Sequence, residues 1–277
     1  MLLHITSKKA RKQKMPLKAA ISGFTTLLRR PQVLLPALIV MAISLLASLA
    51  LGELVFGLLY QGLIYEILPE TGIWEFPFAL YQMYSAEINA LIALLGLSLL
   101  LQIWLAFGYA RFVSGKKKKQ GIFGAMAYAT KNIKHVIAAF IFFGIVSVFF
   151  LILAYLLLAF GFYTDIIAIA LWIVFALLVI YLGIKLIMAV PIMAIEEVNL
   201  KEALQKSWKF SEKHFWGLLA LLAIVFLIVS PALNYVGGSI ADLFVDDMLA
   251  IAVLAIFTLI VTAYTNLAIA LYYVQKS

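Results

Sequence analysis

Six long apolar stretches dominate this chain of 277 residues. A helix needs about 20 largely apolar residues to cross the hydrocarbon core of a bilayer. A soluble protein can bury one or two such helices, but six in one chain predict an all-α integral membrane fold with six transmembrane helices. The expected spans cover approximately residues 33–58, 87–112, 136–161, 164–190, 215–236 and 248–274.

Composition agrees with a membrane protein. The chain is 66% hydrophobic and 12% charged, whereas soluble domains carry roughly 25% charged residues. It contains no cysteine, which excludes disulfides, thiolate nucleophiles and cysteine-type zinc sites. The first apolar stretch starts late and is too long for a signal peptide, so we expect a retained first helix. We therefore predict a basic tail over residues 1–15 and a single helical membrane domain over residues 16–277.

The charges alternate between the two sides of the predicted bundle. The segments before the first span, between the second and third and after the fourth are rich in lysine and arginine, whereas the opposite loops hold only acidic charges. The positive-inside rule then predicts a multi-pass protein of the cell membrane with both termini in the cytoplasm. The aromatic outer loop at 59–86 predicts a segment lying along the outer interface; a lid over a binding site is the alternative.

Three segments on the predicted cytoplasmic side resemble one another. They begin at Leu17, Ile122 and Leu200. In each, a small residue precedes an aromatic one, basic residues follow, and an apolar stretch comes next. The small–aromatic pairs are Gly23-Phe24, Ala127-Tyr128 and Ser207-Trp208. We infer three cytoplasmic amphipathic interfacial helices, each followed by two membrane helices, as a possible threefold internal repeat.

The charge-dense stretch "PIMAIEEVNLKEALQKSW", residues 191–208, contains the third of these helices. Asn199 can cap it, with Glu202 as the reciprocal partner of a capping box. Lysine stems together with Trp208 suit a helix in the headgroup plane, although a helix that binds a protein partner is the alternative. Two ion pairs at i,i+4 spacing are expected along it, Glu197–Lys201 and Glu202–Lys206.

No catalytic or metal-binding set emerges from the polar residues. The three histidines are scattered, and Glu196 and Glu197 are too close in sequence to face one way on a helix. The run "GKKKKQG" lacks the context of a phosphate-binding loop. We expect its lysines, together with Trp208, to contact anionic lipid headgroups; the four lysines are Lys116, Lys117, Lys118 and Lys119. We expect no enzymatic activity, no cofactor, no metal and no nucleic acid partner.

A second group of polar residues falls inside the predicted spans. Ionisable residues there are candidates for ion or substrate movement, and Glu53 and Lys185 qualify. Both are close enough to an interface for their charged ends to reach it, which is the alternative. One face of the last span carries four more polar residues, which could line a path or simply join helices by hydrogen bonds: Thr258, Thr262, Thr265 and Asn266.

The stretch from Ala189 to Phe210 carries a resemblance to a known family. Its elements are Pro191, an acidic residue at Glu196 or Glu197, and an Ala203–Ser207–Trp208 helix. They resemble the membrane domain found beside glycerophosphoryl diester phosphodiesterases, and "AYTNLAIALYYV" is similar to that family's final helix. The resemblance implies a six-helix membrane domain over residues 15–275, but no hydrolase activity.

The leading hypothesis is therefore a non-enzymatic membrane scaffold that binds anionic lipid or a protein partner at the cytoplasmic face. The alternative is a transporter or channel for a small solute or ion, which would use Glu53, Lys185 or the threonine face.

Overall fold

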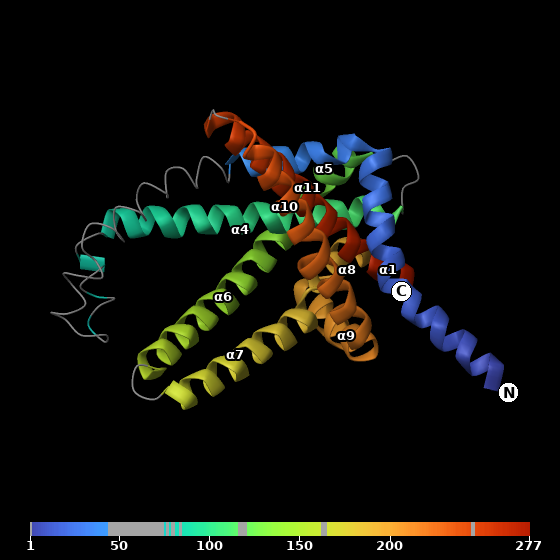
Figure 1. Cartoon of the computed structure of the whole chain (residues 1–277), viewed down its shortest axis with the longest axis horizontal. Helices are drawn as coiled ribbons and strands as arrows, with labels where there is room; N and C mark the ends of the chain where they lie inside the picture. Colours follow the sequence, from blue (N-terminus) through green and yellow to red (C-terminus); the bar gives the residue numbers. More distant parts are fainter. Residues whose placement is uncertain are drawn as a thin grey trace. The chain divides into compact units, whose positions relative to one another are not determined.

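A computed structural model describes most of the chain (Figure 1). The backbone is described for residues 2–43, 75, 78, 81–82, 85–115, 121–161, 165–244 and 247–277. Side chains are described for the same residues except 2–15, 87, 158–161, 165–168 and 247–248. Within these residues the chain is almost entirely helical and contains no strand, so the predicted all-α fold is confirmed.

The described residues form the following helices. They are α1 (Leu2–Arg29), a 3-10 turn (Pro31–Val33) that continues as helix over 34–43, α4 (Ser85–Ser114), α5 (Ile122–Lys131), α6 (Ile133–Gly161), α7 (Asp165–Leu186), α8 (Ala189–Glu196), α9 (Leu200–Ala223), a π-helical segment (Ile224–Val229), α10 (Ser230–Ala241) and α11 (Asp247–Lys276). Three of the described breaks lie at Arg30 before Pro31, at Asn132 and at the αL residue Glu197.

Five helices of the described chain are long and apolar enough to cross a membrane. A sixth is obtained if Pro16–Arg29 and Pro31–Ile43, which meet at 102°, form one bent span. The predicted stretches at 87–112, 136–161, 164–190 and 248–274 correspond to α4, α6, α7 with α8, and α11. The predicted first span, 33–58, continues beyond the described residues.

The helix that contains the fifth predicted span begins earlier in the structure than the sequence predicted. We expected a separate amphipathic helix before residue 215, but α9, the π segment and α10 form one helical stretch of 42 residues, Leu200–Ala241. His214 alone leaves helical geometry within α9, with φ −125° and ψ 19°. The amphipathic part and the apolar part are therefore joined at a kink.

The other two amphipathic segments also end at one non-helical residue. Arg30 follows α1 with φ −138° and ψ 70°. Asn132 follows α5 with φ −100° and ψ 30°, and its side chain donates to the Tyr128 carbonyl. At the break after α1 the chain bends by 102° before the next helix begins.

The described chain forms two compact units. The first comprises Met1–Met41, Gln102–Ala139 and Leu182–Ser277, and the second comprises Ala42–Leu101 and Phe140–Tyr181. In the second unit α6 and α7 contact each other through aromatic rings, with the Phe150 and Phe175 centroids 6.0 Å apart. The predicted tight connection between them falls at 162–164, outside the described residues.

Small residues set the packing of the first unit. Ala19, Gly23 and Leu27 form the buried face of α1, and α1 packs on α11. A Cβ added to Gly23 would lie 3.4 Å from the backbone nitrogen of Ala268 in α11. Close approach of helices at small residues is a usual way of packing in membranes, where lipid tails supply no hydrophobic driving force between helices. The same spacing recurs in α9, which buries Ala203, Ser207 and Ser211.

Candidate functional site

Residues 196–213, here named the α8–α9 junction, contain a network of ion pairs and hydrogen bonds within the first unit. The chain turns sharply between the two helices because Glu197 adopts a left-handed conformation, with φ 62° and ψ 34°. Asn199 then caps α9, its Oδ1 accepting a hydrogen bond of 2.9 Å from the Glu202 amide. This turn directs the neighbouring carboxylates of Glu196 and Glu197 to different partners.

Glu197 binds a buried arginine from α4. The Arg111 Nη1 lies 2.7 Å from the Glu197 Oε1, and Arg111 is only 5% exposed. The guanidinium also lies over the Tyr128 ring of α5, 4.1 Å from its centroid, a favourable cation–π position. Burial raises the pKa of Tyr128, and the nearby Arg111 charge opposes this rise while Glu197 adds to it. The junction is thereby joined to α4 and α5.

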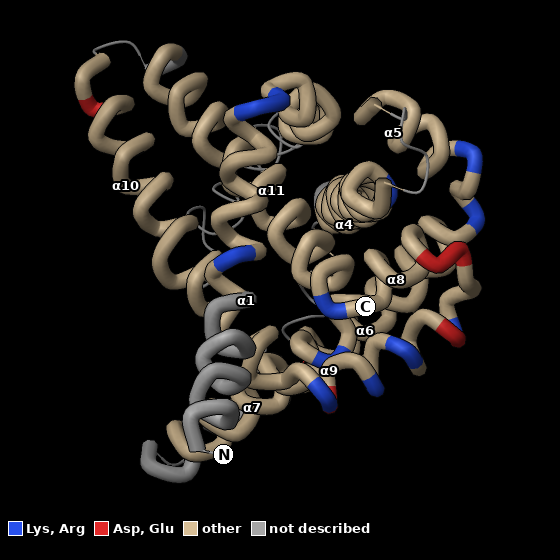
Figure 2. Tube along the Cα trace, turned by 90° about the vertical axis from the view of Figure 1, so that its right-hand side faces the viewer, with Lys and Arg blue, Asp and Glu red and all other residues tan. Residues whose placement is uncertain are grey.

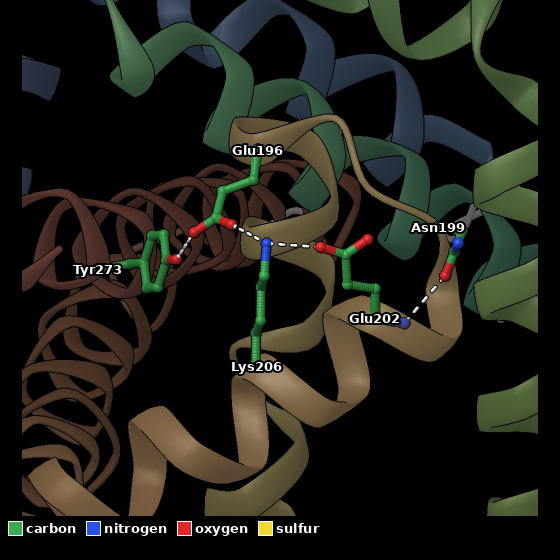
Figure 3. A network of polar contacts seen from close by, with 5 residues as sticks. All are labelled: Glu196, Asn199, Glu202, Lys206 and Tyr273. Carbon is green, nitrogen blue, oxygen red and sulfur yellow. Dashed lines mark hydrogen bonds and ion pairs between the residues drawn. The ribbon is translucent and has the colours of Figure 1, made fainter.

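Glu196 binds two other elements (Figure 3). The Tyr273 hydroxyl, from the end of α11, donates to its Oε1. The Lys206 Nζ lies 2.7 Å from its Oε2 and 2.8 Å from the Glu202 Oε1. Lys206 is thus shared by two carboxylates, and the network joins α8, α9 and α11.

The inner face of α9 covers the end of α7. The Ser207 hydroxyl donates to the Lys185 carbonyl at 2.6 Å, and the Ser211 hydroxyl donates to the Ile184 carbonyl at 2.9 Å. Carbonyls in the last turn of a helix lack partners within the helix, so the two serines cap α7 from outside.

The Lys185 side chain is enclosed by the same helix. It is 3% exposed, its Nζ lies 3.5 Å from the Glu212 Oε1, and the ammonium is 4.6 Å from the Trp208 ring centroid. These contacts place Lys185 in a polar setting at the end of α7.

The outer face of α9 has a different balance of charge. Blue segments recur along this helix in Figure 2. All four acidic residues of the junction, Glu196, Glu197, Glu202 and Glu212, form ion pairs. Three exposed lysines form none within the described part of the chain, namely Lys201, Lys209 and Lys213. Trp208 and Trp216 are exposed on the same helix.

The candidate site residues predicted from the sequence do not form one cluster among the described residues. Lys185 and Trp208 are brought together at α9. Glu53 and Lys116–Lys119 lie outside the described residues. In α11, Thr258 donates to the Leu254 carbonyl and Asn266 to the Thr262 carbonyl, both within their own helix. The Thr265 hydroxyl is buried and has no hydrogen-bond partner in the described part of the chain.

Local predictions for the junction are partly confirmed. The Asn199 cap and the Glu202–Lys206 pair are present. The expected Glu197–Lys201 pair is wrong, because the left-handed turn takes Glu197 out of the helix and toward Arg111.

The sequence did not identify three residues that contact the carboxylates of the α8–α9 junction or lie beside them, namely Arg111, Tyr128 and Tyr273. The one available signal was that Arg111 ends an apolar stretch and stands apart from the lysine run.

Among the described residues, no group of three or more histidine, aspartate or glutamate side chains is arranged to hold a metal ion. No curated protein and no solved structure matches the chain. Residues 157–277, which contain α7 to α11, match the family described as "Membrane domain of glycerophosphoryl diester phosphodiesterase". The predicted resemblance is therefore confirmed over these residues, and the C-terminal part of this multi-pass membrane protein is similar to that membrane domain.

Proposed function

We propose that the protein is a non-enzymatic membrane scaffold that binds anionic lipid headgroups through the outer face of α9. The observation that carries the proposal is the uneven pairing of charges in the junction. Its carboxylates are all held by cations, two of which, Arg111 and Lys185, come from other helices. The exposed lysines of α9 are left to meet the solvent or a bilayer surface.

The tryptophans favour a bilayer as the partner. Indole rings prefer the headgroup level, and lysine stems can lie along apolar surface while the ammonium reaches polar groups. Trp216 is 77% exposed and follows directly after the kink, where α9 becomes apolar. A basic residue near an anionic surface contributes about 1 kcal/mol of attraction, so three lysines can produce a clear preference among lipids.

The proposal includes an orientation. With α9 at the cytoplasmic surface of the cell membrane, both chain termini lie in the cytoplasm, which agrees with the positive-inside rule. Lys116–Lys119 would add a second basic segment on the same side. The contacts of the α8–α9 junction would then hold α5 and the ends of α4, α7 and α11 together beneath the headgroups.

The experiment compares lipid association of the full chain in phosphatidylcholine vesicles that contain spin-labelled phosphatidylglycerol or phosphatidylcholine. We expect a preference for the anionic lipid that weakens with added salt, since exposed charges are screened. The triple variant Lys201→Gln/Lys209→Gln/Lys213→Gln and the neutralised Lys116–Lys119 segment should each reduce it. Gln205→Ala, on the exposed face of α9, is the matched control. A preference insensitive to salt and to both sets of substitutions would refute the lipid-binding role.

A transporter or channel is the second candidate. The observation that favours it is the buried Thr265 hydroxyl, which has no hydrogen-bond partner among the described residues. Solute or ion flux through reconstituted protein that disappears with Thr265→Val, Lys185→Met or Glu53→Gln would support transport. Flux that is absent, or unchanged by all three substitutions, would count against it.

A further inference from the structure

We propose that Lys209 and Lys213 form a binding site for the phosphate of an anionic lipid, and that buried Lys185 keeps this site open by holding Glu212. The inference rests on the proposed function and names the residues that determine its lipid preference.

The position of Glu212 explains why Lys185 is needed to keep Lys209 and Lys213 available for a phosphate. Lys209, Glu212 and Lys213 are all exposed on α9. Residues three or four positions apart are neighbours on a helix surface, and a carboxylate at such spacing pairs readily with a lysine. Glu212 has the reach to do so, because its side chain is 57% exposed. A free Glu212 would therefore compete with a phosphate for Lys209.

Lys185 prevents that competition from inside the fold. Its ammonium is almost completely shielded from solvent and lies 3.5 Å from the Glu212 Oε1. A buried ammonium without a partner carries a large desolvation cost, whereas an exposed lysine is solvated by water. Glu212 therefore gains more by pairing with Lys185 than with Lys209. The serine caps on Ile184 and Lys185 fix the backbone from which this ammonium extends.

The surroundings of the lysines identify a lipid as the source of the phosphate. Lys209 and Lys213 are one helical turn apart, so their ammonium groups can both donate to one phosphate. The exposed Trp216 indole lies three residues beyond Lys213, at the start of the apolar part of α9. A site with cations on one side and an indole with apolar chain on the other fits a phosphate attached to acyl chains at the headgroup level.

The test uses the absence of cysteine from the chain to attach one fluorophore. Ala220→Cys places it on the exposed face of α9 one turn beyond Trp216, and Thr258→Cys on α11 gives a reference for bulk lipid. The protein is reconstituted with phosphatidylglycerol or phosphatidylcholine that carries a nitroxide at the same acyl position. The ratio of quenching by the two lipids measures the local preference.

Single and double substitutions distinguish Lys209 and Lys213, which would bind the phosphate, from Lys185, which would act through Glu212. Lys209→Gln and Lys213→Gln should each lower the ratio at residue 220 by about fivefold, which is the equivalent of about 1 kcal/mol per lysine. Lys185→Met should lower it equally, although Lys185 is buried. Lys185→Met/Glu212→Gln should restore it, because no carboxylate is then free to occupy Lys209. The label at residue 258 should show little change.

A second substitution tests the mechanism without disturbing the interior. Gln205→Glu adds a carboxylate at i,i+4 spacing to Lys209 with no buried cation to hold it, and should lower the ratio as Lys185→Met does. The inference is overturned if Gln205→Glu has no effect, or if folded Lys185→Met keeps the full ratio, or if the double variant fails to restore it. If Lys209→Gln and Lys213→Gln also leave the ratio unchanged, the proposed function fails with it.

Discussion

Arg111 near the end of α4 and Glu197 at the end of α8 form an ion pair across 86 positions of sequence, with 2.7 Å between Nη1 and Oε1. The two partners differ in their access to water, since the arginine side chain is 4% exposed and the glutamate side chain 50%. The pair therefore fixes the turn between α8 and α9 against α4, and the two residues should respond unequally to substitution.

Removal of Glu197 should cost more stability than removal of Arg111. Glu197→Asn tolerates the left-handed backbone but leaves a buried guanidinium without its carboxylate, which we expect to cost about 2 kcal/mol. Arg111→Met leaves only a half-exposed carboxylate that water can solvate. The double variant should be more stable than Glu197→Asn alone. Unfolding in detergent measures the order, and an Arg111→Met protein less stable than the Glu197→Asn protein would contradict this explanation.

The serine caps on α7 should contribute more to stability than an exposed serine does. Ser207→Ala and Ser211→Ala each remove a donor from a buried carbonyl, which should reduce stability by about 1–2 kcal/mol. Ser239→Ala in α10 is the control, because Ser239 is exposed. Thermal unfolding of the three variants provides the comparison; equal midpoints would mean that the hydrogen bonds to Ile184 and Lys185 contribute nothing measurable.

The end of α11 should depend on one hydroxyl. Tyr273→Phe keeps the ring contact with Phe210 but removes the donor to Glu196. A hydrogen bond to a charged group contributes about 2 kcal/mol, and we expect a loss of that size. Tyr235→Phe, at an exposed position of α10, should be neutral. Protease digestion from the C-terminus and thermal unfolding measure both effects, and a neutral Tyr273→Phe would exclude Tyr273 as the residue that holds α11.

Two adjacent glycines of α10 should differ sharply. A Cβ at Gly237 would lie 2.7 Å from the Phe257 Cγ of α11, whereas a Cβ at Gly238 would meet nothing within 4 Å. Gly237→Ala must therefore separate α10 from α11 or displace the Phe257 ring, at a cost of about 1–3 kcal/mol. Gly238→Ala should be neutral or slightly stabilising, since alanine favours helix. Equal stability of the two variants would show that this contact is not close in the folded protein.

The fold was largely predictable because bilayer thickness imposes a length on every span. The apolar stretches at 87–112 and 136–161 needed no tertiary information to be recognised as membrane helices. The continuity of α9 with the fifth span was not predictable, because the break is a change of two dihedral angles at His214 that no residue preference demands.

The site was less predictable, and Lys185 shows why. From sequence it was an ionisable residue inside a span and hence a candidate for transport. Its actual partners, Glu212 and Trp208, lie more than twenty positions later, and only the packing of α9 on the last turn of α7 brings them within reach. The local features, the Asn199 cap and the Glu202–Lys206 pair, were predictable because they depend on helical spacing alone.

The depth of α9 in a bilayer is the direct test of its proposed contact with lipid headgroups. Spin labels at Gln205→Cys, on its exposed face, and at Ala220→Cys, beyond the kink, report accessibility to oxygen from the lipid and to a water-soluble nickel complex. We expect residue 205 to lie at the headgroup level, with intermediate access to both reagents, and residue 220 to lie in the hydrocarbon, with access to oxygen only. Full access of residue 205 to the nickel complex, equal to that of a label in open water, would contradict it.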